Sequence, residues 1–216
     1  MNAEFGAAME DVLDLYEEPY DPTRPNVNFD ETSKQLIAET RVPLPPKPGT
    51  PARYDYEYQR NGTCNLFMFC EPQAGWRHIA VTAQRTMLDF AEQMRWLVDE
   101  QYPDAKVIRV VLNNLNTHKP ASLYEAFAPA EARRILKKLE FHYPPKHGSW
   151  LNMAEIELSV LARQCLRQRI PDVATLAAEV AAWERRRNEA GARTEWRFTT
   201  EDARIKLKHL YPSLQT

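Results

Sequence analysis

The chain has 216 residues, of which 44% are hydrophobic, so it can bury a substantial core and is most simply one domain with appendages. A formal net charge of -2 excludes a globally basic nucleic-acid coat but remains compatible with a local basic groove. Cys64, Cys70 and Cys165 lack metal-binding spacing and are odd in number, which predicts reduced thiols and no zinc site. Without a signal-peptide pattern or an apolar run of membrane-spanning length, we expect a soluble, cytoplasmic protein with no membrane contact.

The first quarter of the chain predicts a helix, a short strand and a long loop. Apolar residues at helical spacing indicate a helix over residues 7–18, and residues 27–31 indicate a short strand that ends in the carboxylates of Asp30 and Glu31. Residues 36–58 contain too many prolines for a central strand or helix. We interpret them as a surface loop and leave open a role in binding a partner.

A hairpin and a helix are predicted next. Asn61-Gly62 indicates a turn before the apolar strand at residues 64–70. The alternating residues 77–81 predict a half-buried strand that pairs antiparallel with it. Thr86 is expected to cap the helix that follows.

The central strand of the predicted sheet lies at residues 107–112. It is almost entirely aliphatic and β-branched, as in a strand buried on both faces, and it turns abruptly polar at Asn113. In an open α/β sheet, the carboxyl ends of strands collect ligands and catalytic side chains. Asn113 is therefore the place where we expect chemistry.

The rest of the chain predicts mostly helices. Helices are expected at residues 122–127, 129–138, 151–169 and from Pro171 and Thr200 onward, with strands at 139–143 and 196–198. This order of elements predicts an α/β fold with a mixed sheet and helices packed against it. A strictly parallel doubly wound sheet would not contain the hairpin.

Three polar residues fall at ends of these elements: Asp30, Asn113 and Glu155. Phosphoryl transfer on nucleic acid needs such convergent oxygens, because two Mg²⁺ ions about 3.5 to 4 Å apart must hold the attacking and leaving oxygens. Carboxylates supply the oxygen ligands that Mg²⁺ prefers. Glu157 lies two residues after Glu155 on one helix, so only one of the two can face such a site, and the other is a solvated or structural charge.

Residues 30–32, 113–118 and 147–155 resemble, in order, the three motifs of the mariner-like bacterial insertion-sequence transposases. Those proteins belong to the DDE superfamily of endonucleases and have an RNase H-like fold. The resemblance covers nearly the whole chain. Those transposases typically also carry amino-terminal helix-turn-helix modules that read transposon ends, and no part of this sequence resembles them. The resemblance implies a lead-in at residues 1–25, an RNase H-like core at 26–170 with an insertion at 36–58, and a helical extension of the same domain at 171–216.

The resemblance also implies a site. Asp30 and Glu155 match the first and third metal-binding carboxylates, which with the second would hold two Mg²⁺ or Mn²⁺ ions, and Asn113 stands where the family has its second catalytic aspartate. An asparagine carbonyl can ligate a metal but brings no charge, and one lost charge about 4 Å from the metal is worth roughly 4 kcal/mol at an effective dielectric of about 20.

We therefore expect a transposase catalytic domain for DNA cleavage and strand transfer at transposon ends that is inactive as written. The alternative is a catalytically silent DNA-binding or dimerisation module derived from a transposase. A third reading, a small-molecule α/β enzyme, lacks the glycine-rich nucleotide loop that it would need.

Five basic side chains are candidates for contact with DNA. His118 contacts phosphate or caps the next helix, and Lys146 and His147 form a phosphate-binding loop before a helix or an ordinary surface turn. Arg163 and Arg167 belong to a basic carboxyl-terminal third that binds phosphates or is simply solvated. In the related transposases, an insertion like residues 36–58 reaches across to a partner subunit, which predicts a homodimer, whereas a loop folded back on its own domain is the alternative.

Overall fold

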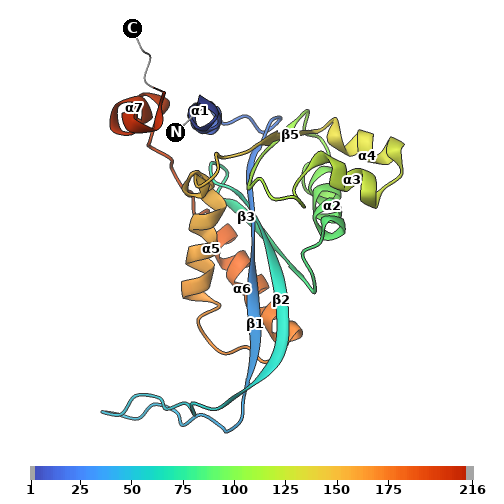
Figure 1. Cartoon of the computed structure of the whole chain (residues 1–216). Coiled ribbons are helices and arrows are strands. Elements are labelled where there is room, and N and C mark those ends of the chain that lie inside the picture. The colour runs from blue at the N-terminus through green and yellow to red at the C-terminus, as the bar shows by residue number, and fades with distance from the viewer. Residues whose placement is uncertain (1–2, 213–216) are drawn as a thin grey trace.

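The structure, a computed structural model that describes residues 3–212, is built on one five-stranded mixed sheet (Figure 1). The strand order is β3-β2-β1-β4-β5, in which β1, β2 and β3 pair antiparallel and β4 and β5 run parallel to β1. The strands are β1 (Asn26–Glu39), β2 (Tyr58–Glu71), β3 (Trp76–Thr82), β4 (Ile108–Leu112) and β5 (Leu139–His142). The predicted mixed sheet and the hairpin of β2 with β3 are therefore confirmed.

Helices cover both faces of the sheet (Figure 1). One face carries α2 (Met87–Trp96) with its π-helical continuation (Leu97–Gln101), α3 (Pro120–Ala126) and α4 (Pro129–Leu136). The other face carries α5 (Met153–Gln164) and α6 (Val173–Glu189). At one end, α1 (Ala3–Glu17) packs beside α7 (Thr200–Lys206), and short 3-10 turns occur at Ser149–Leu151 and Lys208–Leu210. Within residues 3–212, no helix is long and apolar enough to cross a membrane.

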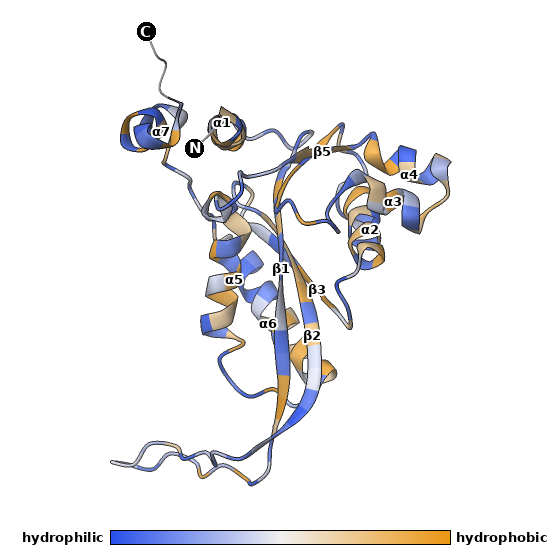
Figure 2. Cartoon of the chain, viewed as in Figure 1, coloured by the Kyte–Doolittle hydropathy of each residue, from blue (hydrophilic) through white to orange (hydrophobic). Residues whose placement is uncertain are grey.

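Alternation along the strands divides the core into two layers. Phe29 and Phe69 face α2, and the centroid of the Phe29 ring lies 4.9 Å from that of Phe69. Met68 faces α5 and α6 on the other side. Because successive side chains in a strand point to opposite faces, Asp30 shares the α5 side with Met68, its partner in β2. Figure 2 shows helices with apolar and polar residues in alternation along the ribbon, which is the pattern of helices with one buried side.

Strand β1 is much longer than the predicted strand at residues 27–31, and the predicted loop at 36–58 is shorter. β1 runs to Glu39 and pairs with β2 from Tyr58, which leaves residues 40–57 as the insertion. Leu36 is buried in the α5–α6 layer, so the outer part of β1 continues the same core as Met68.

The turn predicted at Asn61-Gly62 is wrong. Both residues lie inside β2, where its register with β1 shifts so that two residues of β2 stand opposite Leu36 alone. Gly62 has φ of 93°, a conformation that glycine adopts without steric cost. The Asn-Gly dipeptide, which is typical of a hairpin turn, forms a β-bulge here.

Three further boundaries differ from prediction. The helix expected at 151–169 ends at Gln164 and begins at Met153, because Leu151 belongs to a 3-10 turn. Residues 196–198 form no strand, and the Trp196 ring instead packs on Tyr16 at 5.3 Å between centroids. The last helix is capped by Thr199, whose hydroxyl accepts from the Asp202 amide, and not by Thr200.

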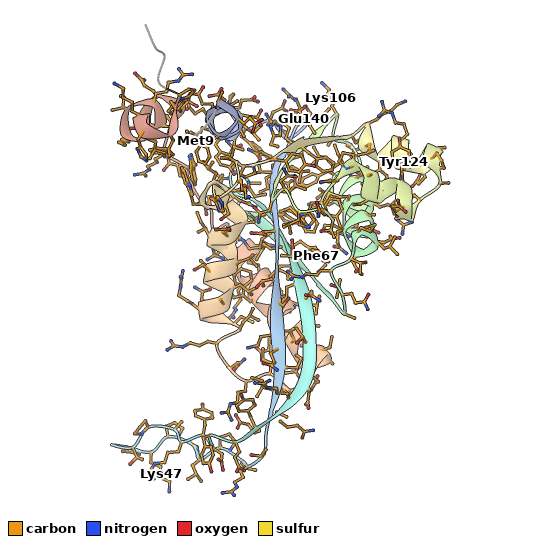
Figure 3. All side chains as sticks on the ribbon, in the orientation of Figure 1. Met9, Lys47, Phe67, Lys106, Tyr124 and Glu140 are labelled. Carbon is orange, nitrogen blue, oxygen red and sulfur yellow. The ribbon has the colours of Figure 1, made fainter. Side chains whose placement is uncertain are left out.

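The insertion, residues 40–57, projects from the body as an extended arm with Lys47 near its tip (Figures 1 and 3). Its two sides are joined by two isolated bridges, Leu44 with Arg53 and Lys47 with Thr50, by an ion pair of Arg41 with Asp55 and by a hydrogen bond from the Thr40 hydroxyl to the Glu57 carbonyl. Its prolines have no amide hydrogen to donate, which explains why the ladder of β1 and β2 does not continue. The arm is a projection, not a loop folded back on the domain.

A buried charge cluster joins α5, β3 and α6. Glu157 is 3% exposed, and its Oε1 accepts from Arg187 Nη2 at 2.8 Å. Its Oε2 lies 3.3 Å from Nε of Arg77, whose side chain is 1% exposed. Glu157 is therefore the structural member of the pair Glu155 and Glu157.

We expect Glu157→Gln to lower the free energy of unfolding by about 3 kcal/mol or more, because it leaves two guanidinium groups without their buried counter-charge. Urea unfolding measures the loss. The matched control is Glu155→Gln, two residues away on the same helix, which removes no ion pair and should leave stability unchanged or slightly raised. Equal losses in both variants would contradict the assignment of Glu157 as the structural carboxylate.

Candidate functional site

Asp30 and Asn113 lie side by side on parallel strands. The register of β1 with β4 pairs Phe29 with Leu112, so the next residue on each chain is Asp30 and Asn113. Asn113 Nδ2 donates to Asp30 Oδ1 at 2.9 Å, and Asp30 is only 6% exposed. β4 ends here while β1 continues, so Asp30 is not at the end of its strand but at the point where β1 leaves β4.

The environment of Asp30 disfavours its ionised form. Burial raises its pKa, and the neighbouring charges of Glu31 and Glu155 raise it further. The Glu31 amide, which donates to Asp30 Oδ1 at 2.9 Å, and the charge of His118 act in the opposite direction. The result is a pKa of about 7 against an ordinary value of 3.8. Glu155, in the first turn of α5, is thus close enough to Asp30 for their charges to interact.

Asn152 fixes the start of α5 against β1. Its Oδ1 caps the helix by accepting from the Ala154 amide at 3.0 Å, and its Nδ2 donates to the Phe29 carbonyl at 2.8 Å. Its own carbonyl accepts from the Glu155 amide at 3.1 Å. This fully buried side chain therefore satisfies the start of α5 and attaches it to β1.

Asp30, Asn113 and the start of α5 meet at one place, here called the corner. Two residues that support it were missed in the sequence analysis. Asn28 Oδ1 accepts from the Met153 amide at 3.1 Å and from the hydroxyl of Tyr16. The single proton of that hydroxyl is shared with the Leu151 carbonyl, which lies 2.7 Å from the Tyr16 oxygen. The available signal was an asparagine between Val27 and Phe29 in a strand buried on both faces, because a buried amide needs partners.

His118 differs from both of its expected roles. It is 1% exposed, so it offers no surface to a DNA phosphate, and α3 begins after Lys119 without a side-chain cap. Its Nε2 lies 3.1 Å from Glu31 Oε2, and its Nδ1 lies 3.1 Å from the Asn113 carbonyl. The imidazole thus connects the residue after Asp30 with the backbone of Asn113.

The other basic candidates separate into two groups. Lys146 and His147 line an open cavity of about 980 Å³ together with Asn114, the residue after Asn113. Arg163 lies in the last turn of α5, and Arg167 lies beyond it, with Arg163 bonded to Ser159 Oγ at 2.6 Å. α5 runs beside β1 toward the arm (Figure 1), so these arginines lie along the flank and not at the cavity.

The residues at this corner do not fit a divalent metal as they stand. Asn113 directs its amide nitrogen at Asp30, because its oxygen there would face another oxygen, so it presents hydrogen atoms and not a lone pair. Asp30 also has reduced tendency to ionise near neutral pH. Among residues 3–212, no group of three or more His, Cys, Asp or Glu is placed to hold a metal ion.

A five-stranded mixed sheet with this strand order, flanked by helices and carrying Asp30 beside Asn113 on its parallel strands, has the architecture of the RNase H-like class. A family model described as DDE superfamily endonuclease matches residues 25–177. The chain belongs to that family. No curated protein matches it in sequence.

Solved structures of the Mos1 mariner transposase are similar in fold. The paired-end complex with Mn has a TM-score of 0.57 at 14% identity, covering 89% of this chain and 59% of that chain. A pre-cleavage Mos1 transpososome has a TM-score of 0.52 at 14% identity, covering 87% and 62%. This chain thus spans about three fifths of the Mos1 length, and the likeness confirms the RNase H-like fold.

The raised pKa of Asp30 predicts a pH-dependent stability. The carboxyl contributes its full stability below its unfolded value of 3.8 and loses it as pH rises through about 7. Asp30→Asn removes this titration and keeps the hydrogen bond with Asn113. The difference in unfolding free energy, variant minus parent, should therefore grow by about 2 to 3 kcal/mol from about pH 5 to about pH 8. Urea unfolding of both proteins across this range is the measurement, and a pH-independent difference would contradict the burial argument.

Proposed function

We propose that this chain is the core of a transposase for DNA strand cleavage and transfer at transposon ends, and that Asn113 silences its cleavage step. The observation that carries the proposal is the hydrogen bond from Asn113 Nδ2 to Asp30 Oδ1. Membership of the DDE superfamily endonuclease family supports the reaction type. The similar Mos1 structures are paired-end, pre-cleavage and strand-transfer complexes, which supports transposon-end DNA as the partner.

The silencing has an electrostatic reason. Two-metal phosphoryl transfer needs oxygens that carry negative charge and converge on the ions. Here the Asp30 oxygen already accepts from the Asn113 amide and from the Glu31 amide. The corner is satisfied within the protein, so a divalent cation would have to displace hydrogen bonds while gaining one charge fewer than in a site with three carboxylates.

The other candidate function is a catalytically silent DNA-binding or subunit-pairing module, and the arm favours it. The arm exposes 91% of Val42 and 86% of Tyr56, apolar surface that no part of the described chain covers. The two functions are compatible in one protein, since a silent core that keeps its pairing surface can still occupy transposon ends.

Asn113→Asp should create divalent-metal binding, because it replaces the amide donor with a carboxylate next to Asp30 and Glu155. Calorimetric titration with Mn²⁺ is the direct measurement. We expect binding by the variant at least tenfold tighter than by the parent, which corresponds to about 1.4 kcal/mol. The same titration with Asn114→Asp, which adds the same charge one residue away, controls for nonspecific attraction.

A nicking assay on transposon-end DNA with Mg²⁺ or Mn²⁺ tests the rest of the proposal. The parent should not cleave, and Asn113→Asp should cleave unless Asp30→Ala is added. Metal-dependent cleavage by the parent that is lost in Asp30→Ala would overturn the silencing by Asn113. If Asn113→Asp binds Mn²⁺ no better than Asn114→Asp, then Asp30, Asn113 and Glu155 do not form one site.

The arm is expected to pair two copies of the chain. Its prolines restrict the unfolded chain, so docking on a partner loses less entropy than docking of a flexible loop. Replacing residues 41–56 by a short Gly-Ser linker should convert a dimer to a monomer in sedimentation experiments. The double variant Val42→Ser, Tyr56→Ser should weaken the dimer, whereas Ile205→Ser, an exposed apolar residue on α7, should not. If parent and linker variant have the same mass at high concentration, the arm is not the pairing element.

A further inference from the structure

The cavity beside Asn114 has a lining that differs from the rest of the site. Its walls come from α1, from the loop between β5 and α5, and from the carboxyl-terminal turn. Aromatic and proline side chains dominate, and a basic pair stands at one side. The lining includes Phe5, Tyr143, Pro144, Pro145, Trp150, Lys146 and His147. At about 980 Å³, the cavity is at the upper end of the range for small-ligand sites.

Trp150 is held in place as an exposed aromatic surface. Its ring stacks on Trp196 with 6.2 Å between centroids and 20° between planes, and Phe198 meets it edge-on at 6.0 Å. Trp196 is fixed in turn by its Nε1, which donates to the Phe198 carbonyl at 2.7 Å. Trp150 lines the cavity, and 42% of its surface remains exposed. A rigid, exposed indole is suited to stacking because little conformational entropy remains to be lost.

The loop that carries the basic pair is also preorganised. The Gly148 amide donates to the Pro145 carbonyl at 2.7 Å, and a Cβ on Gly148 would lie 2.7 Å from Pro145 Cγ. His147 has φ of 67°, which is uncommon outside glycine and is often found at functional positions. Lys146 and His147 are exposed there, and Glu4 is the acidic residue of the lining.

Resting on the proposed function, we infer that this cavity binds an unpaired nucleobase of the DNA strand that reaches the Asp30–Asn113 corner. The base stacks on Trp150, and the adjoining phosphate contacts Lys146 and His147. Base–aromatic stacking is largely independent of sequence, because every base has a π-face. The position fits an extruded or terminal nucleotide, since Asn114 joins the cavity wall directly to Asn113 and Trp150 lies five residues before Glu155.

The test measures binding without metal, so it does not depend on cleavage. A fluorescently labelled single-stranded oligodeoxynucleotide is titrated in EDTA at fixed salt with the parent, Trp150→Leu, Trp150→Phe and Lys146→Gln. A second oligonucleotide of equal length has the same backbone and no bases. We expect Trp150→Leu to bind the normal strand about tenfold more weakly, within the range for loss of one stacked base. Trp150→Phe should recover most of this affinity.

The abasic strand separates stacking from phosphate contact. It should bind the parent and Trp150→Leu equally, whereas Lys146→Gln should weaken both strands by the same factor. Tyr124→Leu is the control, an exposed aromatic on α3 far from α1 and its Met9 (Figure 3). Unchanged circular dichroism and unfolding midpoints show that each variant is folded.

The outcomes distinguish this inference from the proposed function. Binding of both strands by the parent that is unaffected by Trp150→Leu overturns the nucleobase site and leaves the transposase core intact. A loss in Trp150→Leu that is equally large on the abasic strand also overturns it, because the ring would then act on the backbone or on the loop. No binding of normal single-stranded or double-stranded DNA by the parent overturns both.

Discussion

The parallel pairing of β1 with β4 is the constraint on which the site depends. The register that sets Phe29 opposite Leu112 places Asp30 beside Asn113, and the two strands separate at that point. β4 ends at Leu112, so Asp30 has no strand partner on that side. Its neighbours there are the side chain of Asn113, just after β4, and the charge of Glu155 on α5. A slip of one residue would turn Asp30 to the α2 side, because side chains alternate in a strand. The phenylalanine-rich layer beside α2 and the position of Asp30 beside Asn113 are therefore consequences of one register.

Second to this pairing comes the attachment of α5. Its first turn is bound to β1 by two buried asparagines, Asn28 and Asn152, which satisfy the Met153 amide and the Phe29 carbonyl. Buried amides cost free energy unless their hydrogen bonds are made, so these contacts determine the helix position more strictly than apolar packing does. Glu155 is placed by its backbone, and Glu157, two residues on, is placed by ion pairs.

Much of this was predictable from the sequence, and the failures share a cause. The order of elements and the hairpin follow from hydrophobic periodicity, which is a local signal, whereas the candidate triad comes from ordered motifs and stays a prediction. The length of β1 and the bulge at Gly62 were not predictable, because they depend on pairing with a strand thirty residues away in sequence. His118 was misread for the same reason: its partners, Glu31 and the Asn113 carbonyl, meet it only in three dimensions. Asn28 and Tyr16 were missed because a single buried amide has no periodicity.

The corner as a whole is balanced without an ion. On one face of β1, the Asp30 carboxyl accepts a hydrogen bond from the Asn113 amide. On the other face, the Glu31 carboxylate contacts the His118 imidazole. An aspartate at position 113 would instead place a second carboxylate against Asp30, with Glu155 nearby, and like charges at this range disfavour ionisation of the cluster. A bound cation would relieve that repulsion without protonation, so stability without metal and affinity for metal oppose each other at this one side chain. Under the proposed function, Asn113 favours stability without a metal at the expense of metal affinity, while the strands that position Asp30 and Asn113 are kept.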